Sequence, residues 1–285
     1  MSCSRTTLLL AALLLAAAPA RAALAPWVGT ADYTAGPNGV PSGEVVGPFD
    51  TYDLATGVAL WQGVRNANVG DTFDGWYQGV VVAHERVVPD AAGVVPSPGL
   101  NATGSGGGYE ITYTAHLVHQ LNGAAMVGTH LVAEVAVTGG SFTFYLDGSP
   151  DRSYAADSGF DDGAVILSGQ VAGGWGVLQD LDPSPPGGAL TGIGFGLDVH
   201  DPDIFEPDSL AHAMINLYVG SPPSLEFGGG TGSLPGVLGH PFDDTSDILF
   251  GTVGQAGFQA VPEPLSLLLV ATALGGLAVG RRLAR

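Results

Sequence analysis

Between residues 26 and 260, apolar and polar residues alternate over short stretches, and this pattern constrains the fold more than any other feature. No stretch in this region keeps apolar residues at helical spacing for three turns without a Gly or Pro interrupting it. The alternating stretches run over about 5 to 10 residues and are bounded by Gly, Pro, Asn and Asp, which is typical of half-buried β-strands. The sequence therefore predicts an all-β chain.

Several strands can be assigned from this alternation. Residues 109–117 place odd-numbered apolar side chains on one face and polar ones, from Glu110 to His116, on the other. Residues 131–137 and 142–146 alternate in the same way, and Thr-Gly-Gly-Ser at 138–141 predicts a tight hairpin between them. Further strands are predicted at 58–62, 77–88, 164–171, 190–199, 211–219 and 247–253. About nine to eleven strands without helical connections favour a single β-sandwich or jelly-roll-like domain over residues 23–260.

The first 22 residues have the organisation of a secretory signal peptide. Arg5 precedes an apolar run at 8–18, and small residues at Ala20 and Ala22 mark a cleavage site before Ala23. The run is too short to cross a bilayer core of about 30 Å. We therefore expect signal peptidase to remove this segment during export; the alternative is a retained anchor helix.

The last 25 residues have three parts. A proline-flanked motif comes first, followed by an apolar run at 265–280 and a basic end. By the positive-inside rule, the arginines stay in the cytoplasm and the chain before them lies outside. The motif and the basic end comprise Val261, Pro262, Glu263, Pro264, Arg281, Arg282 and Arg285.

This order of a Val-Pro-Glu-Pro motif, a short apolar helix and an arginine cluster resembles the PEP-CTERM sorting signal. The resemblance implies a bacterium that has an outer membrane and makes an exopolysaccharide. It also implies recognition by a membrane-embedded exosortase, cleavage near Glu263, and release to the cell surface or matrix after transient inner-membrane association. The alternative is an ordinary C-terminal anchor, and both interpretations place residues 23–260 outside the cytoplasmic membrane.

Short motifs within residues 23–260 resemble the flocculation-associated PEP-CTERM proteins. This resemblance implies a matrix protein that holds cells together in flocs with exopolysaccharide, and it implies no catalytic residues. The motifs are Gly-Asp-Thr-Phe at 70–73, Tyr-Glu-Ile-Thr-Tyr at 109–113, Gly-Ser-Phe-Thr-Phe-Tyr at 140–145, the segment 159–169, and Pro-Phe-Asp-Asp-Thr-Ser-Asp at 241–247.

The chain is strongly acidic, with 27 acidic residues, 8 arginines, no lysine and a net charge of −19. Five arginines lie in the two terminal segments, so the part between them has three arginines against 26 acidic residues, about −23. Such a surface repels phosphate backbones, which excludes nucleic-acid binding. The only cysteine, Cys3, lies in the leader, so the mature chain has no disulfide.

Three acidic clusters are the only candidates for a catalytic or metal site. A glycosidase needs two suitably spaced carboxyl groups, one of them with a raised pKa, and no motif here indicates such a pair. We therefore predict no catalytic residues. Calcium is the candidate cofactor because it binds carboxylate and carbonyl oxygens in loops, and the alternative is solvated turn residues. The candidate calcium ligands are Asp198, Asp201, Asp203, Glu206 and Asp208; the other clusters are Asp157, Asp161 and Asp162, and Asp243, Asp244 and Asp247.

Aromatic residues offer a candidate sugar contact. Trp76 and Tyr77 begin a predicted strand after Asp-Gly, so one of the two points outward, although packing in the core is the alternative. His116 and His119 lie three apart on a strand and therefore face opposite sides, so they do not share a metal.

These features predict a non-enzymatic, exported protein of the cell surface or extracellular matrix. We expect it to be sorted by exosortase and to act with exopolysaccharide in flocculation or biofilm cohesion. The alternative is a carbohydrate-binding module or a polysaccharide-modifying enzyme that uses the acidic loop clusters.

Overall fold

The computed structural model describes residues 25–36, 40, 44–87, 92–102, 107–179, 187–220 and 234–260. Almost all of them belong to one compact unit, Pro26–Ala260. Among the described residues, the regular structure is strand except for one 3₁₀ turn at Val64–Asn66, so the prediction of an all-β chain is confirmed.

Within the described ranges, fifteen strands follow one another, several of them long. They are β1 (Ala25–Pro26), β2 (Gly29–Asp32), β3 (Val45–Phe49), β4 (Thr51–Trp61), β5 (Thr72–Arg86), β6 (Gly93–Val95), β7 (Glu110–Val127), β8 (His130–Asp147), β9 (Ala164–Gln179), β10 (Gly187–His200), β11 (Phe205–Glu206), β12 (Leu210–Gly220), β13 (Gly236–Val237), β14 (His240–Pro241) and β15 (Ile248–Ala260).

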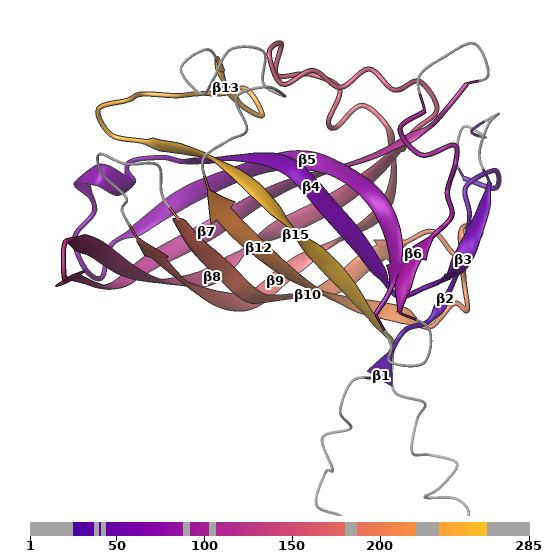
Figure 1. The fold of residues 1–285 in the computed structure, drawn as a ribbon, viewed down its shortest axis with the longest axis horizontal. Helices are drawn as coiled ribbons and strands as arrows, with labels where there is room; N and C mark the ends of the chain where they lie inside the picture. The colour runs from indigo at the N-terminus through magenta and orange to yellow at the C-terminus, as the bar shows by residue number, and fades with distance from the viewer. Residues whose placement is uncertain are drawn as a thin grey trace, which may run out of the picture. The chain divides into compact units, whose positions relative to one another are not determined.

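Eight long strands form one antiparallel sheet that closes on itself (Figure 1). The order is β4-β5-β7-β8-β9-β10-β12-β15, and β15 pairs with β4, for example through Leu249 opposite Leu60. A β-sandwich or jelly roll consists of two packed sheets, whereas here a single sheet has no free edge along these strands. The prediction of a β-sandwich or jelly roll is therefore corrected, because the long strands form one closed sheet. Alternation in the sequence defines which residues form strands, but it does not define which strands pair.

The closed sheet is filled by side chains. Eight strands enclose an interior just wide enough for them, and large aromatic residues occupy it, including Trp61, Tyr113 and Phe144, all fully buried. The apolar face predicted for residues 109–117 is confirmed, because all five of its side chains are buried. Glycine makes room for Tyr113, since a Cβ at Gly79 would lie 2.6 Å from its ring.

The hairpin predicted at 138–141 is wrong, because these residues lie inside the continuous strand β8. The register between β7 and β8 shifts beside them, between Val118 and His119. Gly140 has φ of 125°, and a Cβ there would lie 2.0 Å from the carbonyl oxygen of His116. Gly140 therefore marks an irregularity at which the strands approach closely, a role that glycine also serves in strands.

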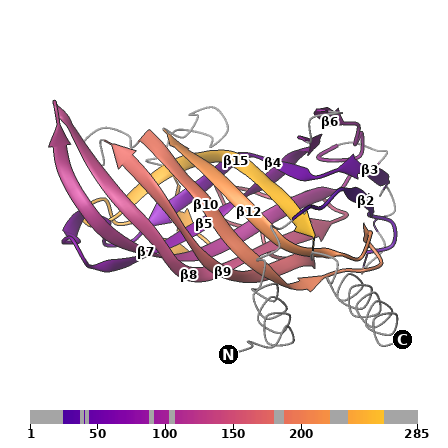
Figure 2. The ribbon, with the colours of Figure 1, turned by 90° about the horizontal axis from the view of Figure 1, so that it is seen from below.

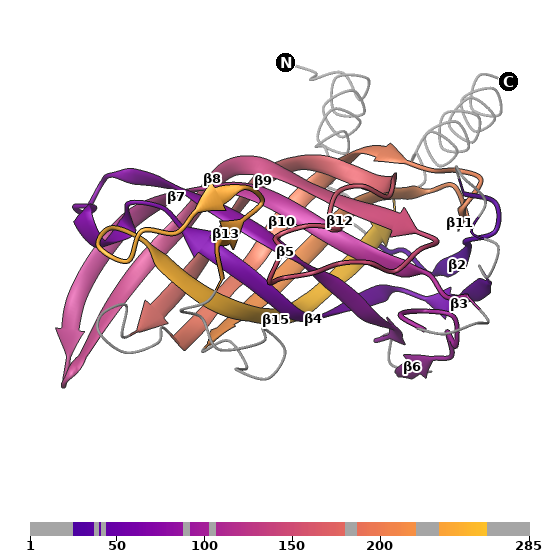
Figure 3. The same ribbon diagram turned by 90° about the horizontal axis from the view of Figure 1, so that it is seen from above.

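Two segments cover part of the outer face. Figure 3 shows β13 over the sheet from above, and Figure 2 shows strands β7, β8, β9, β10 and β12 from below. The hairpin β13–β14 packs over β4 and β15, where Val237 joins a small apolar cluster with Leu60 and Leu249. Tyr154, from the segment between β8 and β9, packs against the same cluster. Val58 and Leu60 of β4 are consequently buried although they do not face the interior.

Candidate functional site

A shallow, open hollow lies where β4 ends and β5 begins. Its volume is about 430 Å³, within the range of roughly 300–1,000 Å³ that is common for ligand sites. Most of its lining is polar: Gln62, Gly63, Asn66, Ala67, Asp71, Thr72, Phe73 and Asp74. We call this feature the rim hollow.

The loop that shapes the rim hollow is fixed at both ends. Gly63, with φ of 73°, begins the 3₁₀ turn, and its N–H donates to Oδ1 of Asp247 at 2.8 Å. Further along, the N–H of Asn68 donates to Oδ2 of Asp71 at 2.8 Å. Hydrogen bonds from Asn68 hold the pKa of Asp71 below its ordinary value, so this carboxyl group is ionised at neutral pH. The N–H of Leu121 on β7 donates to the carbonyl of Asp71, which ties the loop to the sheet.

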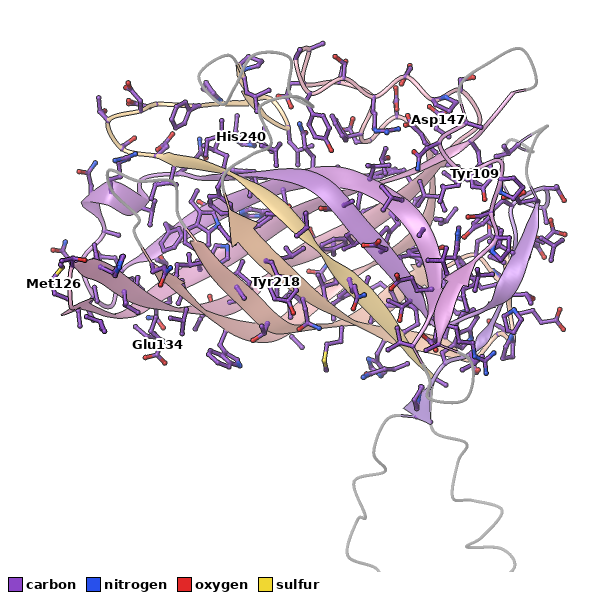
Figure 4. The ribbon with its side chains drawn as sticks, viewed as in Figure 1. Tyr109, Met126, Glu134, Asp147, Tyr218 and His240 are labelled. Atoms are coloured by element: carbon purple, nitrogen blue, oxygen red, sulfur yellow. The ribbon has the colours of Figure 1, made fainter. Side chains whose placement is uncertain are left out.

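Trp76 contacts Gln62, one of the residues that line the rim hollow. Its Nε1 donates to Oε1 of Gln62 at 2.8 Å, and its ring is stacked between His116 and His240, with centroid distances of 4.1 and 3.6 Å. Figure 4 shows His240, which comes from strand β14. Nε2 of His116 lies 2.7 Å from Oδ1 of Asp74. Both faces of Trp76 are covered, so the prediction that a sugar stacks on this ring is wrong; the residue instead positions Gln62.

Tyr77 does not contact a ligand outside the sheet, which corrects the second half of that prediction. It points into the interior and is fully buried. Nε1 of Trp61 donates to its hydroxyl at 2.6 Å, and the same hydroxyl lies 2.9 Å from Nε2 of His119. Burial raises the pKa of Tyr77. His119 is thus inward and His116 outward, as their spacing predicted.

Two of the acidic residues predicted to bind calcium, Asp201 and Asp208, have partners within the chain. Oδ1 of Asp201 accepts the N–H of Asp203 at 2.9 Å, and Asp208 contacts His200. Among the described residues, the group of three acids whose oxygens lie within 4.8 Å of one another is elsewhere, at Glu110, Asp147 and Asp151. The structure therefore does not gather Asp198, Asp201, Asp203, Glu206 and Asp208 in this way, and calcium stays a prediction.

Acids of the other two predicted clusters hold loops in place. Asp157 accepts the N–H of Leu238 through Oδ1 at 2.9 Å and that of Gly239 through Oδ2 at 2.7 Å. Leu238 and Gly239 both have positive φ, so their N–H groups converge on one anion. Oδ2 of Asp247 accepts the N–H of Asp243 at 3.0 Å. These carboxylates satisfy backbone donors.

Sequence reasoning missed a buried ion pair. Glu110 is fully buried and contacts Nη1 of Arg152. Its Oε1 also accepts the N–H groups of Asp151 and Arg152, at 3.0 and 3.2 Å. Asp147 lies beside this pair, and burial raises its pKa. Only three arginines lie between the terminal segments. An arginine that is this rare in an acidic chain is a signal for a paired acid, and Arg152 could have indicated the buried Glu110.

The residues predicted for export and sorting lie outside the described residues: Ala20, Ala22, Ala23, Val261, Pro262, Glu263, Pro264, Arg281, Arg282 and Arg285. In the part of the chain that the structure describes, no helix combines the length and apolar character needed to cross a membrane. Comparison with protein-family models, with curated proteins and with solved structures finds no match for this chain.

Proposed function

We propose that this chain is a non-enzymatic, exported protein of the cell surface or extracellular matrix. It takes part in exopolysaccharide-associated cohesion of cells, in flocs or biofilm. The rim hollow carries the proposal, because it is an open, largely polar hollow where β4 ends and β5 begins in a closed, filled sheet. The terminal segments support the delivery route: signal peptidase, transient inner-membrane association, and exosortase.

The delivery route predicts two new chain ends. Cleavage before Ala23 and near Glu263 removes both apolar segments, so the mature protein lacks Arg285. Mass spectrometry of the protein from culture fluid and from cells measures both ends. A C-terminus that still reaches Arg285 would contradict sorting by exosortase.

The lining of the rim hollow suits sugar hydroxyls. A hydroxyl group both donates and accepts, carboxylates accept, and side-chain amides do both. Asp71 and Asp74 offer the acceptors, and Asn66 and Gln62 offer amides. Two carboxylates repel an anionic sugar unless a cation lies between them. We therefore expect a neutral segment of the polysaccharide to bind there.

The described acids support a non-enzymatic function. Asp157 and Asp247 hold backbone N–H groups, and Glu110 is paired with Arg152. A glycosidase instead needs two carboxyl groups on opposite sides of a bound sugar. The hollow also favours a second candidate, a carbohydrate-binding module without a role in cohesion. Measuring flocculation of cells as well as glycan binding by the purified protein distinguishes the two candidates.

Binding of neutral oligosaccharides is expected to depend on the rim hollow. In a glycan array of neutral and uronic-acid oligosaccharides, the Asp74→Asn and Asn66→Ala variants should bind neutral probes at least tenfold more weakly than the unmodified protein, the loss of about one good hydrogen bond. Asp244→Asn removes the same charge from an exposed acid outside the hollow and should leave binding unchanged.

Cells that produce Asp74→Asn should also flocculate less than cells that produce Asp244→Asn. Loss of glycan binding with unchanged flocculation would favour the carbohydrate-binding module. Equal binding by both variants would overturn the assignment of the hollow.

A further inference from the structure

Two histidines border the rim hollow without lining it. Trp76 lies between them, and its ring is nearly parallel to both, with interplanar angles of 13°. Trp76 belongs to β5, His116 to β7 and His240 to β14, so three different strands supply the stacked rings. Figure 4 shows His240 on the outside of the closed sheet. We call Trp76, His116 and His240 the ring stack.

The ring stack contacts two residues that line the rim hollow. Nε2 of His116 lies 2.7 Å from Oδ1 of Asp74, and Nε1 of Trp76 donates to Oε1 of Gln62 at 2.8 Å. The side chain of His116 is 34% exposed and that of Asp74 is 54% exposed, so protons reach both from solvent. A charge on the ring stack therefore acts directly on the hollow.

The charge of the ring stack depends on its two histidines, because histidine is the residue type whose charge changes between pH 5 and pH 8. Among the residues that line the hollow, Asp71 and Asp74 are the charged ones. When both histidines are neutral, these two carboxylates make the hollow negative. When both are protonated, His116 forms an ion pair with Asp74, and His240 adds a second cation on the other face of Trp76. Two imidazolium groups then balance two carboxylates.

The groups that surround the ring stack favour its protonated form. An imidazolium over the face of an aromatic ring gains a cation–π attraction, for which Trp is the best partner. Asp74 faces His116, and Oδ2 of Asp157 accepts the N–H of Gly239, the residue before His240. His119 lies on the inner face of β7 and stays neutral, because burial and the neighbouring His116 lower its pKa to about 3.

The other charged groups near the hollow keep their charge. Hydrogen bonds from Asn68 hold the pKa of Asp71 below its ordinary value, and those from Thr245 do the same for Asp243, in the segment after β14. Nε of Arg65, in the turn beside the hollow, donates to the carbonyl of Asp247 at 2.8 Å. Ordinary carboxyl groups titrate near pH 4 and arginine above about pH 12. Acidification from pH 7.5 to pH 5.5 therefore acts on the histidines.

We propose that the ring stack sets which sugars the rim hollow accepts: neutral segments near pH 7.5, and uronic-acid segments as well once acidification protonates His116 and His240. The proposal rests on the proposed function, because it assigns a second ligand class to the same hollow. Two carboxylates repel an acidic sugar, and a neighbouring cation offsets that repulsion. The carboxylate of the sugar itself stays ionised at pH 5.5, since carboxyl groups titrate near pH 4. The cations that an acidic sugar needs thus belong to the protein.

Calorimetric binding of neutral and uronic-acid hexasaccharides to the exported protein, at pH 7.5 and pH 5.5, tests this proposal. Acidification should strengthen binding of the uronic-acid probe by about fivefold or more, the effect of one charge at short range in water. Binding of the neutral probe should change less than about twofold, since an uncharged sugar meets no such repulsion. The double variant His116→Gln with His240→Phe keeps an amide donor for Asp74 and a ring on Trp76 but takes up no proton. It should bind the uronic-acid probe equally at both pH values and keep neutral binding.

The matched control is His212→Gln, which removes a histidine from β12, a strand that does not line the hollow. This variant should retain the full effect of pH. Circular dichroism at pH 5.5 identifies variants that are folded, and His116→Gln alone, which should lose most of the effect, keeps the test valid if the double variant does not fold.

Two results overturn the proposal: uronic-acid binding that does not strengthen at pH 5.5, and strengthening that persists in the double variant. In both cases, neutral binding that is weakened by Asp74→Asn still supports the proposed function. Neutral binding that Asp74→Asn leaves unchanged at both pH values contradicts the assignment of the hollow itself, and the ring stack then has no sugar site to control.

Discussion

Acidification from pH 6.5 to pH 4 is expected to remove several kcal/mol of stability from this protein. Burial lowers the pKa of His84 to about 3, and burial together with the neighbouring His116 lowers that of His119 to about 3. The unfolded chain takes up these protons near pH 6.5, whereas the folded chain does so only near pH 3. Stability therefore falls as pH falls within this window, by about 1.4 kcal/mol per pH unit for each histidine.

Three acids oppose this trend at the lower end of the window. Burial raises the pKa of Asp53, Glu85 and Asp147, so folding favours their protonated forms and gains stability as pH falls through the raised values. The histidine effect is consequently clearest between pH 5 and pH 6, where a combined loss of about 2–3 kcal/mol is expected.

Urea unfolding at pH 7, 6 and 5 measures this loss. His119→Phe should lower the slope by about one proton, that is by about 1.4 kcal/mol per pH unit, whatever its effect on stability at pH 7. Val69→Ala changes an exposed residue without adding or removing a titratable group and should leave the slope unchanged. Identical slopes in both variants would show that His119 is not a neutral buried group.

Arg152→Ala is expected to lower the free energy of unfolding by about 3 kcal/mol. The reason is the fully buried carboxylate of Glu110, which contacts Nη1 of Arg152 and is close to Asp147 and Asp151. Nη1 of Arg152 also donates to Oδ1 of Asn101 at 3.0 Å. Removal of the arginine leaves a buried charge beside two other acids, and that cost exceeds the loss of one ordinary hydrogen bond.

A double-mutant cycle separates this effect from simple loss of packing. Glu110→Gln removes the buried charge, so the pair Glu110→Gln with Arg152→Ala should be more stable than Arg152→Ala alone. Urea unfolding at pH 7 measures all four proteins. A cost below about 1 kcal/mol for Arg152→Ala, or no rescue by Glu110→Gln, would contradict this account.

Sequence reasoning predicted the strands better than their partners. The alternation at 109–117 correctly separated inward from outward side chains, because a period of two is a local property. It could not decide which of Trp76 and Tyr77 pointed inward, since that depends on the closure of the sheet. The hairpin at 138–141 failed because glycine serves both turns and close approaches between strands.

The candidate site was less predictable than the fold, for a related reason. Glu110 was correctly placed on the outer face of its strand, but the segment that contains Arg152 covers that face and buries the carboxylate. The rim hollow combines a loop after β4 with Asp74 on β5, and Asp247, far away in the sequence, fixes its shape. No local pattern reports contacts of this kind.

The pairing of β15 with β4 has a consequence for the timing of folding. Trp61 lies opposite Ile248, so the last pairing joins residues almost two hundred positions apart. Contacts this distant form late and slowly. A chain that emerges from its N-terminus cannot complete the sheet until Ala260 has also emerged, and until then β4 and its partners present open edges to other chains. Delivery of the C-terminal end is thus the step that commits the protein to its native state.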